Sequence, residues 1–391
     1  MITGLSLGPY SVGVTTVQID GDPKRGRGLQ TEIWYPCTDS DAPAVTKYSD
    51  YLGLDTAKDP VEALRAANAG SAIGGYRDGL TIEELDDPRR TTWLTNAIRN
   101  AKVLAPTSTN SKYPLVLFSH GSGAYRASYG FWTEFLASHG YVVAACDHPG
   151  SARYTIVDGE VITPGGPRSE RSKMESDRPL DLIQMIDGIE GMGKESGSDN
   201  KLFETIDTDT VAITGMSFGG FTTVATLELQ DPRIKAAVAM ASSMSMSGTQ
   251  DYHTPARKNK STPAMIMIGT EDSVLGTKHN DANRQYIKHH DDGDAYLLEI
   301  VRGGHVSFTS CELYNPEYGN GINAEGVSKS LTQPGSTYRP WDIVKQHEVV
   351  NHYGLRFLDK YLKNKDVTVG RDEKQFDPAE VIFRSNRDSS L

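Results

Sequence analysis

The run of residues that most constrains this chain is TVAITGMSFGGFTTVATLEL, at positions 210–229. An apolar segment typical of a strand leads into Gly215-Met216-Ser217-Phe218-Gly219, and a helical pattern follows. In this context the G-x-S-x-G turn holds its serine in a strained backbone conformation, with the hydroxyl exposed at the end of a sheet. Glycine is needed on both sides because a Cβ there would strike the neighbouring strand or helix. Ser217 is therefore predicted to be a nucleophile. The alternative is a glycine-rich turn without chemistry.

A serine hydroxyl needs a base to remove its proton and a carboxylate to orient that base. In chains with this turn the order is serine, acid, histidine. His305 follows a predicted strand at 296–301 and the loop Arg302-Gly303-Gly304, which places it where such sites are built. His305 is therefore the predicted base. Four other histidines fall in helical or polar stretches and are interpreted as structural or solvated: His289, His290, His347 and His352.

The acid is expected between the serine and the histidine, just past a strand. The apolar segment 265–269 leads into Thr270-Glu271-Asp272. Asp272 is the predicted acid because the usual turn places the aspartate a few residues beyond the strand. Glu271 and Asp251 remain alternatives.

Acyl transfer also needs an oxyanion hole, which is built from two backbone N–H groups. One comes from the residue after the nucleophile, here Phe218. The other comes from an earlier strand-to-helix loop, and the apolar strand at 114–119 ends in His120-Gly121-Ser122-Gly123. The amide of Ser122 is the expected second donor.

The rest of the chain alternates short apolar runs with amphipathic stretches, a pattern that predicts βαβ units and a mostly parallel sheet covered by helices. The fold class is therefore predicted to be α/β. Strands are predicted at 12–19, 29–35, 114–119, 141–146, 210–214, 235–241, 264–268 and 296–301. Helices are predicted at 129–139, 179–190, 218–230, 280–290 and 341–363.

Three segments break this alternation and are interpreted as insertions. The first, 39–109, contains helical patterns at 61–68 and 92–103 and is expected to form a helical lid over the active site. The segments 151–177 and 310–339 are rich in polar residues and glycine and are expected to be long loops beside the site. Since the three chemical residues must meet at one sheet edge, residues 1–391 are predicted to form a single catalytic domain.

Composition excludes several classes of function. The 391 residues carry 40 basic and 51 acidic side chains, a net charge of −11, so there is no basic surface for nucleic acid. No apolar run reaches the roughly 18 residues that a membrane span needs. The chain shows no signal peptide and is expected to be cytoplasmic at face value, or exported if a signal was removed. Of three cysteines, Cys146 is interpreted as a core thiol, and a pair between Cys37 and Cys311 stays open.

Several segments together carry a family resemblance: FSHGSGAYRASYGFWTEFLASHGYVVAACDHPG, GMSFGG, GTEDSV and GGHVSF, in that order, with GPYSVGV and TEIWYP before them. The chain resembles the α/β-hydrolases that include plasma-type platelet-activating-factor acetylhydrolases and dienelactone-hydrolase-like bacterial esterases. The resemblance implies an α/β-hydrolase fold and a calcium-independent serine esterase. It implies Ser217, Asp272 and His305 as catalytic triad and the amides of Ser122 and Phe218 as oxyanion hole. The chain departs from the commonest lipase pattern at Met216, where histidine is frequent.

The expected activity is hydrolysis of small or short-acyl esters, and of polyesters too, with no metal and no organic cofactor. An amidase or lactonase with the same triad is the main alternative, and a non-catalytic binding protein is a weaker one. Four residues near the expected mouth are candidates for substrate contact, with a plain core position as the equal alternative: Met216, Tyr125, Tyr129 and Phe308. Four arginines are candidates for meeting an anionic group on the substrate, although solvated surface positions are the favoured interpretation: Arg126, Arg153, Arg168 and Arg171.

Overall fold

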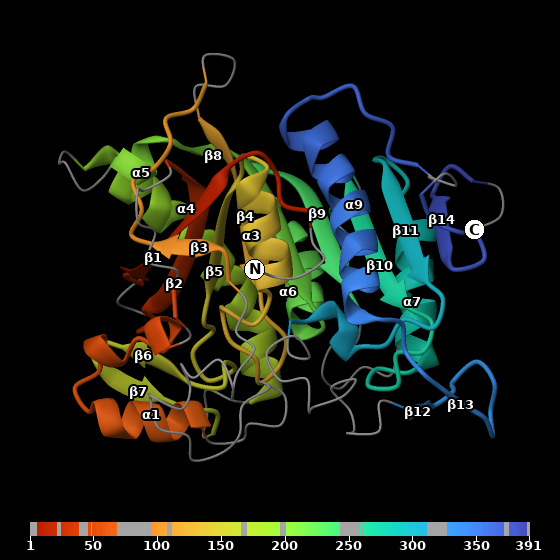
Figure 1. The fold of residues 1–391 in the computed structure, drawn as a ribbon, viewed down its shortest axis with the longest axis horizontal. Helices are drawn as coiled ribbons and strands as arrows, with labels where there is room; N and C mark the ends of the chain where they lie inside the picture. Colours follow the sequence, from red (N-terminus) through yellow and green to blue (C-terminus); the bar gives the residue numbers. More distant parts are fainter. Residues whose placement is uncertain are drawn as a thin grey trace.

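The structure, a computed structural model, describes residues 6–21, 25–38, 46–47, 49–68, 95–107, 112–165, 170–195, 201–242, 259, 261–310, 327–370 and 375–388. Its centre is a ten-stranded sheet with the order β14-β11-β10-β9-β8-β4-β5-β2-β1-β3 (Figure 1). The strands are β1 (Ser11–Ile19), β2 (Leu29–Cys37), β3 (Ala97–Arg99), β4 (Tyr113–Ser119), β5 (Val142–Cys146), β8 (Ile206–Met216), β9 (Ile234–Met240), β10 (Ala264–Gly269), β11 (Ala295–Ile300) and β14 (Val381–Ser385).

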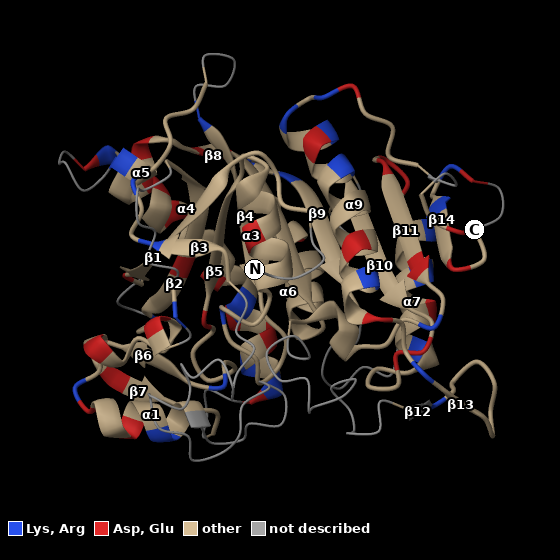
Figure 2. Ribbon diagram, viewed as in Figure 1, with Lys and Arg blue, Asp and Glu red and all other residues tan. Residues whose placement is uncertain are grey.

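All neighbouring strands from β5 through β4, β8, β9 and β10 to β11 are parallel. The antiparallel pairs lie outside this block, between β1 and β2, β2 and β5, and β11 and β14. The predicted α/β class with a mostly parallel sheet is confirmed. Strands β4, β5 and β10 carry no charged side chain, as expected for strands that are covered on both faces (Figure 2).

Helices cover both faces of the sheet. The helices are α1 (Pro60–Asn68), α3 (Gly130–Ser138), α4 (Arg171–Lys194), α5 (Lys201–Glu204), α6 (Phe218–Leu227), α7 (Thr277–Lys288) and α9 (Ile343–Leu362). The apolar side chains of α3 and α9 join a core with alternate residues of the strands, and Figure 1 shows both helices in front of the sheet. The other alternate residues pack against α4, α6 and α7. Among the described residues, no helix has the length and apolar character to cross a membrane.

The insertions contain more regular structure than the sequence patterns suggest. A helix was expected at 92–103, but Ala97–Arg99 forms the edge strand β3 beside β1, so this prediction is wrong. Pairing with β1 decides the outcome, because a three-residue strand gains its hydrogen bonds from the neighbouring strand rather than from local propensity. The structure describes only part of the region 39–109; α1 and two short 3₁₀ helices, Ser49–Tyr51 and Leu54–Thr56, lie within it. Its role as a lid stays a prediction.

The other two insertions also differ from plain loops. Segment 151–177 holds the hairpin of β6 (Thr155–Val157) and β7 (Glu160–Ile162) and the first residues of α4. Helix α4 therefore begins at Arg171 and runs through Pro179, where the sequence pattern put its start. In 310–339 a small hairpin pairs β12 (Ser328–Lys329) with β13 (Thr337–Tyr338), and residues 311–326, which include Cys311, lie outside the described residues. Cys37 and Cys146 are both buried.

Candidate active site

Ser217 occupies a strained turn between β8 and α6. Its backbone has φ 57° and ψ −115°, a region that side-chain-bearing residues rarely adopt. The Ser217 amide donates to the carbonyl of Met240 at the end of β9, 2.9 Å away, which fixes the turn to the next strand. A Cβ on Gly219 would lie 1.8 Å from the carbonyl oxygen of Ser119, and one on Gly215 would lie 2.4 Å from that of Gly219. Close packing therefore requires glycine at both positions, as the sequence pattern predicts.

Asp272 and His305 are joined directly. Nδ1 of His305 lies 2.6 Å from Oδ2 of Asp272. Asp272 is fully buried, and its other oxygen accepts from the amides of Val274 and Leu275 at 3.1 and 2.9 Å. With both oxygens occupied in this way, the carboxylate accepts the Nδ1 proton and leaves Nε2 of His305 as the basic nitrogen.

Backbone hydrogen bonds connect the serine turn to the histidine loop across one edge of the sheet. The Ala241 amide after β9 donates to Met267 of β10 at 2.8 Å, and the Thr270 amide after β10 donates to Ile300 of β11 at 3.0 Å. The ends of β8, β9, β10 and β11 thus lie at one edge of the sheet, and Ser217 and His305 both follow strands that end there. In the described residues no hydrogen bond joins the Ser217 hydroxyl to His305; such catalytic hydrogen bonds often tighten only when a substrate is bound.

Glu271, the alternative acid, has different partners from Asp272. Its carboxylate accepts from the hydroxyl of Ser330 at 2.9 Å, from the amide of Leu331 at 2.5 Å and from the hydroxyl of Thr332. It therefore anchors the segment before β13 to the acid turn. The geometry favours Asp272 over Glu271. Asp251 lies outside the described residues.

The H-G-S-G loop after β4 lies against the serine turn. A Cβ on Gly121 would be 3.5 Å from the Cβ of Ser217, and the Gly121 amide donates to the hydroxyl of Tyr129 at 2.9 Å. The next amide along the loop is that of Ser122. Among the described residues, no group accepts a hydrogen bond from it. Phe218 begins α6, where the first amides of a helix have no partner within it. Both expected oxyanion donors are thus at the serine turn, and their catalytic role stays a prediction.

The four residues expected to contact substrate are almost completely buried: Met216 is 2% exposed, Tyr125 1%, Tyr129 1% and Phe308 0%. All four belong to the main apolar core. The Tyr129 hydroxyl also lies 3.7 Å from the sulfur of Met216, so it links the H-G-S-G loop to the residue before the nucleophile. Their placement shows a packing role, and direct contact with a substrate stays a prediction.

The candidate arginines lie in different environments. Arg126 is fully buried and pairs with Asp147 at 2.5 Å and with Glu32 at 3.2 Å, so its charge is already compensated. Arg153 is 6% exposed, and Arg168 is outside the described residues. Arg171 is the most accessible of the described three, with a side chain 39% exposed that lies over the ring of Phe218 at 3.9 Å.

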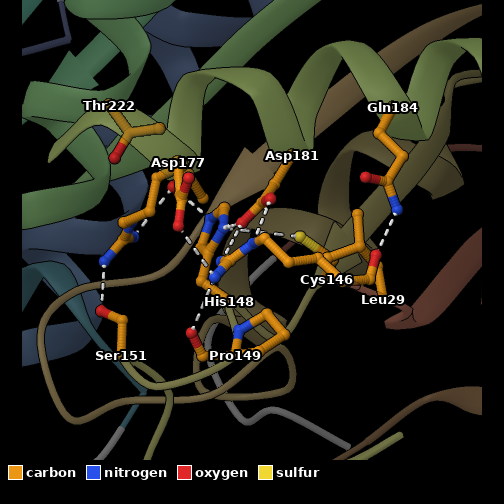
Figure 3. Close-up of polar contacts among 12 residues, drawn as sticks. Leu29, Cys146, His148, Pro149, Ser151, Asp177, Asp181, Gln184 and Thr222 are labelled. Atoms are coloured by element: carbon orange, nitrogen blue, oxygen red, sulfur yellow. Dashed lines mark hydrogen bonds and ion pairs between the residues drawn. The ribbon is translucent and has the colours of Figure 1, made fainter. Parts of the chain in front are cut away.

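The sequence patterns did not identify a buried polar cluster directly beneath the H-G-S-G loop. Its members are His148 and Asp181, which Figure 3 labels, together with Ser119, Arg178 and Arg27. A signal for it exists in the sequence, because polar residues follow two predicted strands that end near each other, at Ser119-His120 and Asp147-His148. Asp181 lies in the predicted helix 179–190 and Arg178 directly precedes it; neither gave such a signal, since charged residues on a helix are usually solvated.

Comparisons with known proteins show which families this chain is similar to. A family model described as platelet-activating factor acetylhydrolase, isoform II, matches residues 87–174, and the prolyl oligopeptidase family model matches residues 200–263. The platelet-activating factor acetylhydrolase of Bos taurus is 30% identical over 63% of this chain and 56% of its own length. That of Gallus gallus is 25% identical over 92% of this chain and 83% of its own length. The matched part of the chain spans little more than half the length of the mammalian relatives.

Among solved structures, a ferulic acid esterase from Streptomyces cinnamoneus is similar to this chain with a TM-score of 0.64 and 22% sequence identity, covering 96% of each chain. The chain has the α/β-hydrolase fold, and the expected resemblance to platelet-activating-factor acetylhydrolases is confirmed.

Proposed function

We propose that this α/β-hydrolase is a serine carboxylic ester hydrolase that works through an acyl-enzyme. The observation that carries the proposal is a strained Ser217 turn and a buried Asp272–His305 pair that follow strands ending at one edge of the sheet; Nδ1 of His305 lies 2.6 Å from Oδ2 of Asp272. This is the arrangement of nucleophile, base and orienting acid that acyl transfer requires. The acetylhydrolase and esterase relatives support the same class of reaction.

In the first half of the reaction, Nε2 of His305 takes the proton of Ser217 as its oxygen attacks the ester carbonyl. Asp272 holds the imidazole in the required tautomer and stabilises the imidazolium that forms. The amides of Ser122 and Phe218 bind the oxyanion. His305 then gives its proton to the leaving alcohol, and a water molecule repeats the sequence on the acyl-enzyme.

We assign short-acyl or small esters as the substrate class, polyesters included. Met216 and Phe218 flank Ser217 in the turn and Phe308 follows His305; each of these apolar side chains has an exposed fraction of 2% or less. Such packing leaves little room for a long acyl chain next to the nucleophile. The names of the acetylhydrolase relatives, which specify a two-carbon acyl group, point the same way.

The test is a series of p-nitrophenyl esters of increasing acyl length, with the Ser217→Ala variant as control, together with fluorophosphonate labelling. We expect Ser217→Ala to lower kcat by about 10⁴ or more, because the other triad members cannot act without the nucleophile. The wild type should react with the fluorophosphonate and prefer the shortest acyl chains. If Ser217 is not labelled and the variant hydrolyses esters as fast as the wild type, the chain is not a serine esterase.

A second candidate function is hydrolysis of amides or peptides, which the match of residues 200–263 to the prolyl oligopeptidase family favours. Matched p-nitrophenyl ester and p-nitroanilide substrates with the same acyl group separate the two functions. A kcat/KM for the anilide equal to or above that for the ester would assign the chain to the amidases.

A further inference from the structure

Arg178 is a buried charge that no carboxylate compensates directly. Its side chain on α4 is 0% exposed, and no carboxylate oxygen of the described residues lies within 4.0 Å of its guanidinium nitrogens. Its hydrogen bonds go to neutral oxygens instead: Nη1 donates to Ser151 Oγ at 2.8 Å, and Nη2 donates to Ser119 Oγ at 3.0 Å and to the carbonyl of His120. Burial lowers the pKa of Arg178 to about 9. Burial of a guanidinium without a carboxylate partner carries a large desolvation free energy, so its presence here needs an explanation.

The contacts around Arg178 form a chain of hydrogen bonds that converges on the carboxylate of Asp181. Arg27 donates to Asp181 at 2.9 and 2.7 Å, and Nδ1 of His148 lies 2.9 Å from the same carboxylate (Figure 3). Since Nδ1 carries the proton toward Asp181, Nε2 of His148 accepts from Ser119 Oγ at 2.9 Å. The Ser119 oxygen then accepts from Arg178. Burial lowers the pKa of His148 to about 3, which keeps the ring neutral as this chain requires.

This second Ser–His–Asp arrangement is not a second active site. Ser119, His148 and Asp181 are each 0% exposed, so no substrate reaches them. This chain of hydrogen bonds holds in place the end of β4, which directly precedes Gly121 and Ser122.

The guanidinium of Arg178 also contacts the other side of the proposed oxyanion hole. Its central carbon lies 4.3 Å from the centroid of the Phe218 ring. The planar, forked shape of a guanidinium lets one side chain bond several oxygens and stack on a ring at once, which a lysine cannot do. Arg178 thus touches both segments that carry the two expected donors, the His120 carbonyl before Ser122 and the side chain of Phe218.

We propose that Arg178 is the positioning residue of the oxyanion hole, fixing the Ser122 loop relative to the Phe218 amide. This inference rests on the proposed esterase function. The chain of buried hydrogen bonds from Arg27 through Asp181 and His148 holds Ser119, and Arg178 connects that chain to the serine turn. Loss of this link separates the two donors and weakens binding of the tetrahedral intermediate more than binding of the ester.

The test compares a trifluoromethyl ketone, which adds to Ser217 as a hemiketal whose oxyanion occupies the hole, with the ester substrate itself. For Arg178→Met we expect the inhibition constant of the ketone to rise and kcat to fall by roughly 10- to 100-fold, somewhat less than deletion of a donor. KM should change less than about threefold, because the ester ground state makes little use of the hole. Arg178→Lys keeps the charge without the fork and should show an intermediate loss.

The control is Arg233→Met, which removes a partly buried arginine that is bonded to Asp231 and Asp187 at the opposite end of β9. We expect it to change thermal stability but not the inhibition constant. If Arg178→Met does not fold, Ser119→Ala breaks the same link and should weaken binding of the ketone by about tenfold. If the folded variants have an inhibition constant and a kcat within threefold of those of the wild type, the inference is overturned. If Ser217→Ala remains active, the proposed function fails as well, so the two failures are distinguishable.

Discussion

Asp272 and Glu271 are adjacent in the chain, but their carboxylates have separate tasks. Asp272 binds His305, and Glu271 binds the backbone and hydroxyls of residues 330–332. Asp272→Asn would keep the size of the side chain but present an amide to the Nδ1 proton, which favours the wrong tautomer of His305. We expect kcat to fall about 10³- to 10⁴-fold, as for comparable changes in serine hydrolases.

Glu271→Gln is the matched control for that variant. It should lose part of the anchoring of residues 330–332 and speed proteolysis there, with kcat reduced less than about tenfold. Measuring both variants with one ester decides the assignment. If kcat falls further in Glu271→Gln than in Asp272→Asn, Glu271 is the acid instead of Asp272.

Residues with a local signal could be predicted from the sequence, and those defined by long-range contacts could not. Ser217, Asp272 and His305 each follow a recognisable apolar strand, and parallel strands end at one edge. Arg178 and Ser119 are 59 positions apart, and His148 and Asp181 are 33 apart. No spacing in the sequence indicates that these side chains meet, because their contacts depend on how α4 packs against the ends of β4 and β5.

At the scale of elements, α4 shows how tertiary contacts override a local rule. Proline usually occupies the first turn of a helix, so the pattern placed the start of this helix at Pro179. The structure continues the helix back to Arg171. Arg27 bonds both Asp177 and Asp181, one on each side of the proline, and these buried ion pairs stabilise the additional turns.

The long helix α9 begins at a capping residue that can be tested. The Asp342 carboxylate accepts from the amides of Val344 and Lys345 at 2.9 and 3.3 Å. Asp342→Ala leaves these amides without that acceptor and should lower the free energy of unfolding by about 1 kcal/mol. Glu348→Ala, an exposed substitution on the same helix, is the control and should change it by less than about 0.5 kcal/mol. Urea unfolding of both variants checks this; equal effects would contradict the capping role.

At the scale of the whole molecule, buried histidines tie folding to pH. His347 of α9 stacks on Phe131 at 3.7 Å between ring centroids, and Nε2 bonds the carbonyl of Thr309 at 2.9 Å. Burial lowers its pKa from 6.5 to about 3. Between these two pKa values His347 binds a proton in the unfolded chain but not in the folded one. Its contribution to the free energy of unfolding is therefore fully present above pH 6.5 and falls as the pH drops toward 3.

His347→Gln removes this proton while retaining a donor for Thr309. Between pH 4 and 6, its unfolding free energy should fall less steeply with decreasing pH than that of the wild type, by about 1.4 kcal/mol per pH unit. His289→Gln, which changes an exposed histidine at the end of α7, is the matched control. Chemical denaturation at several pH values measures the slopes. Parallel curves for His347→Gln and the wild type would show that this histidine does not titrate on unfolding.

The pairing of β4 with β8 sets the alignment of the whole site. Ser119 is opposite Gly215 in this pair, and the carbonyl of Ser119 lies where a Cβ on Gly219 would be. A slip of two residues would keep every side chain on its own face, yet it would move the serine turn along β4 by roughly 6.6 Å. It would also bring a different residue against the Ser119 carbonyl, where only glycine fits. Gly215 and Gly219 thus select one register during assembly of the sheet, because only the register that aligns the site also allows α6 to pack against β4.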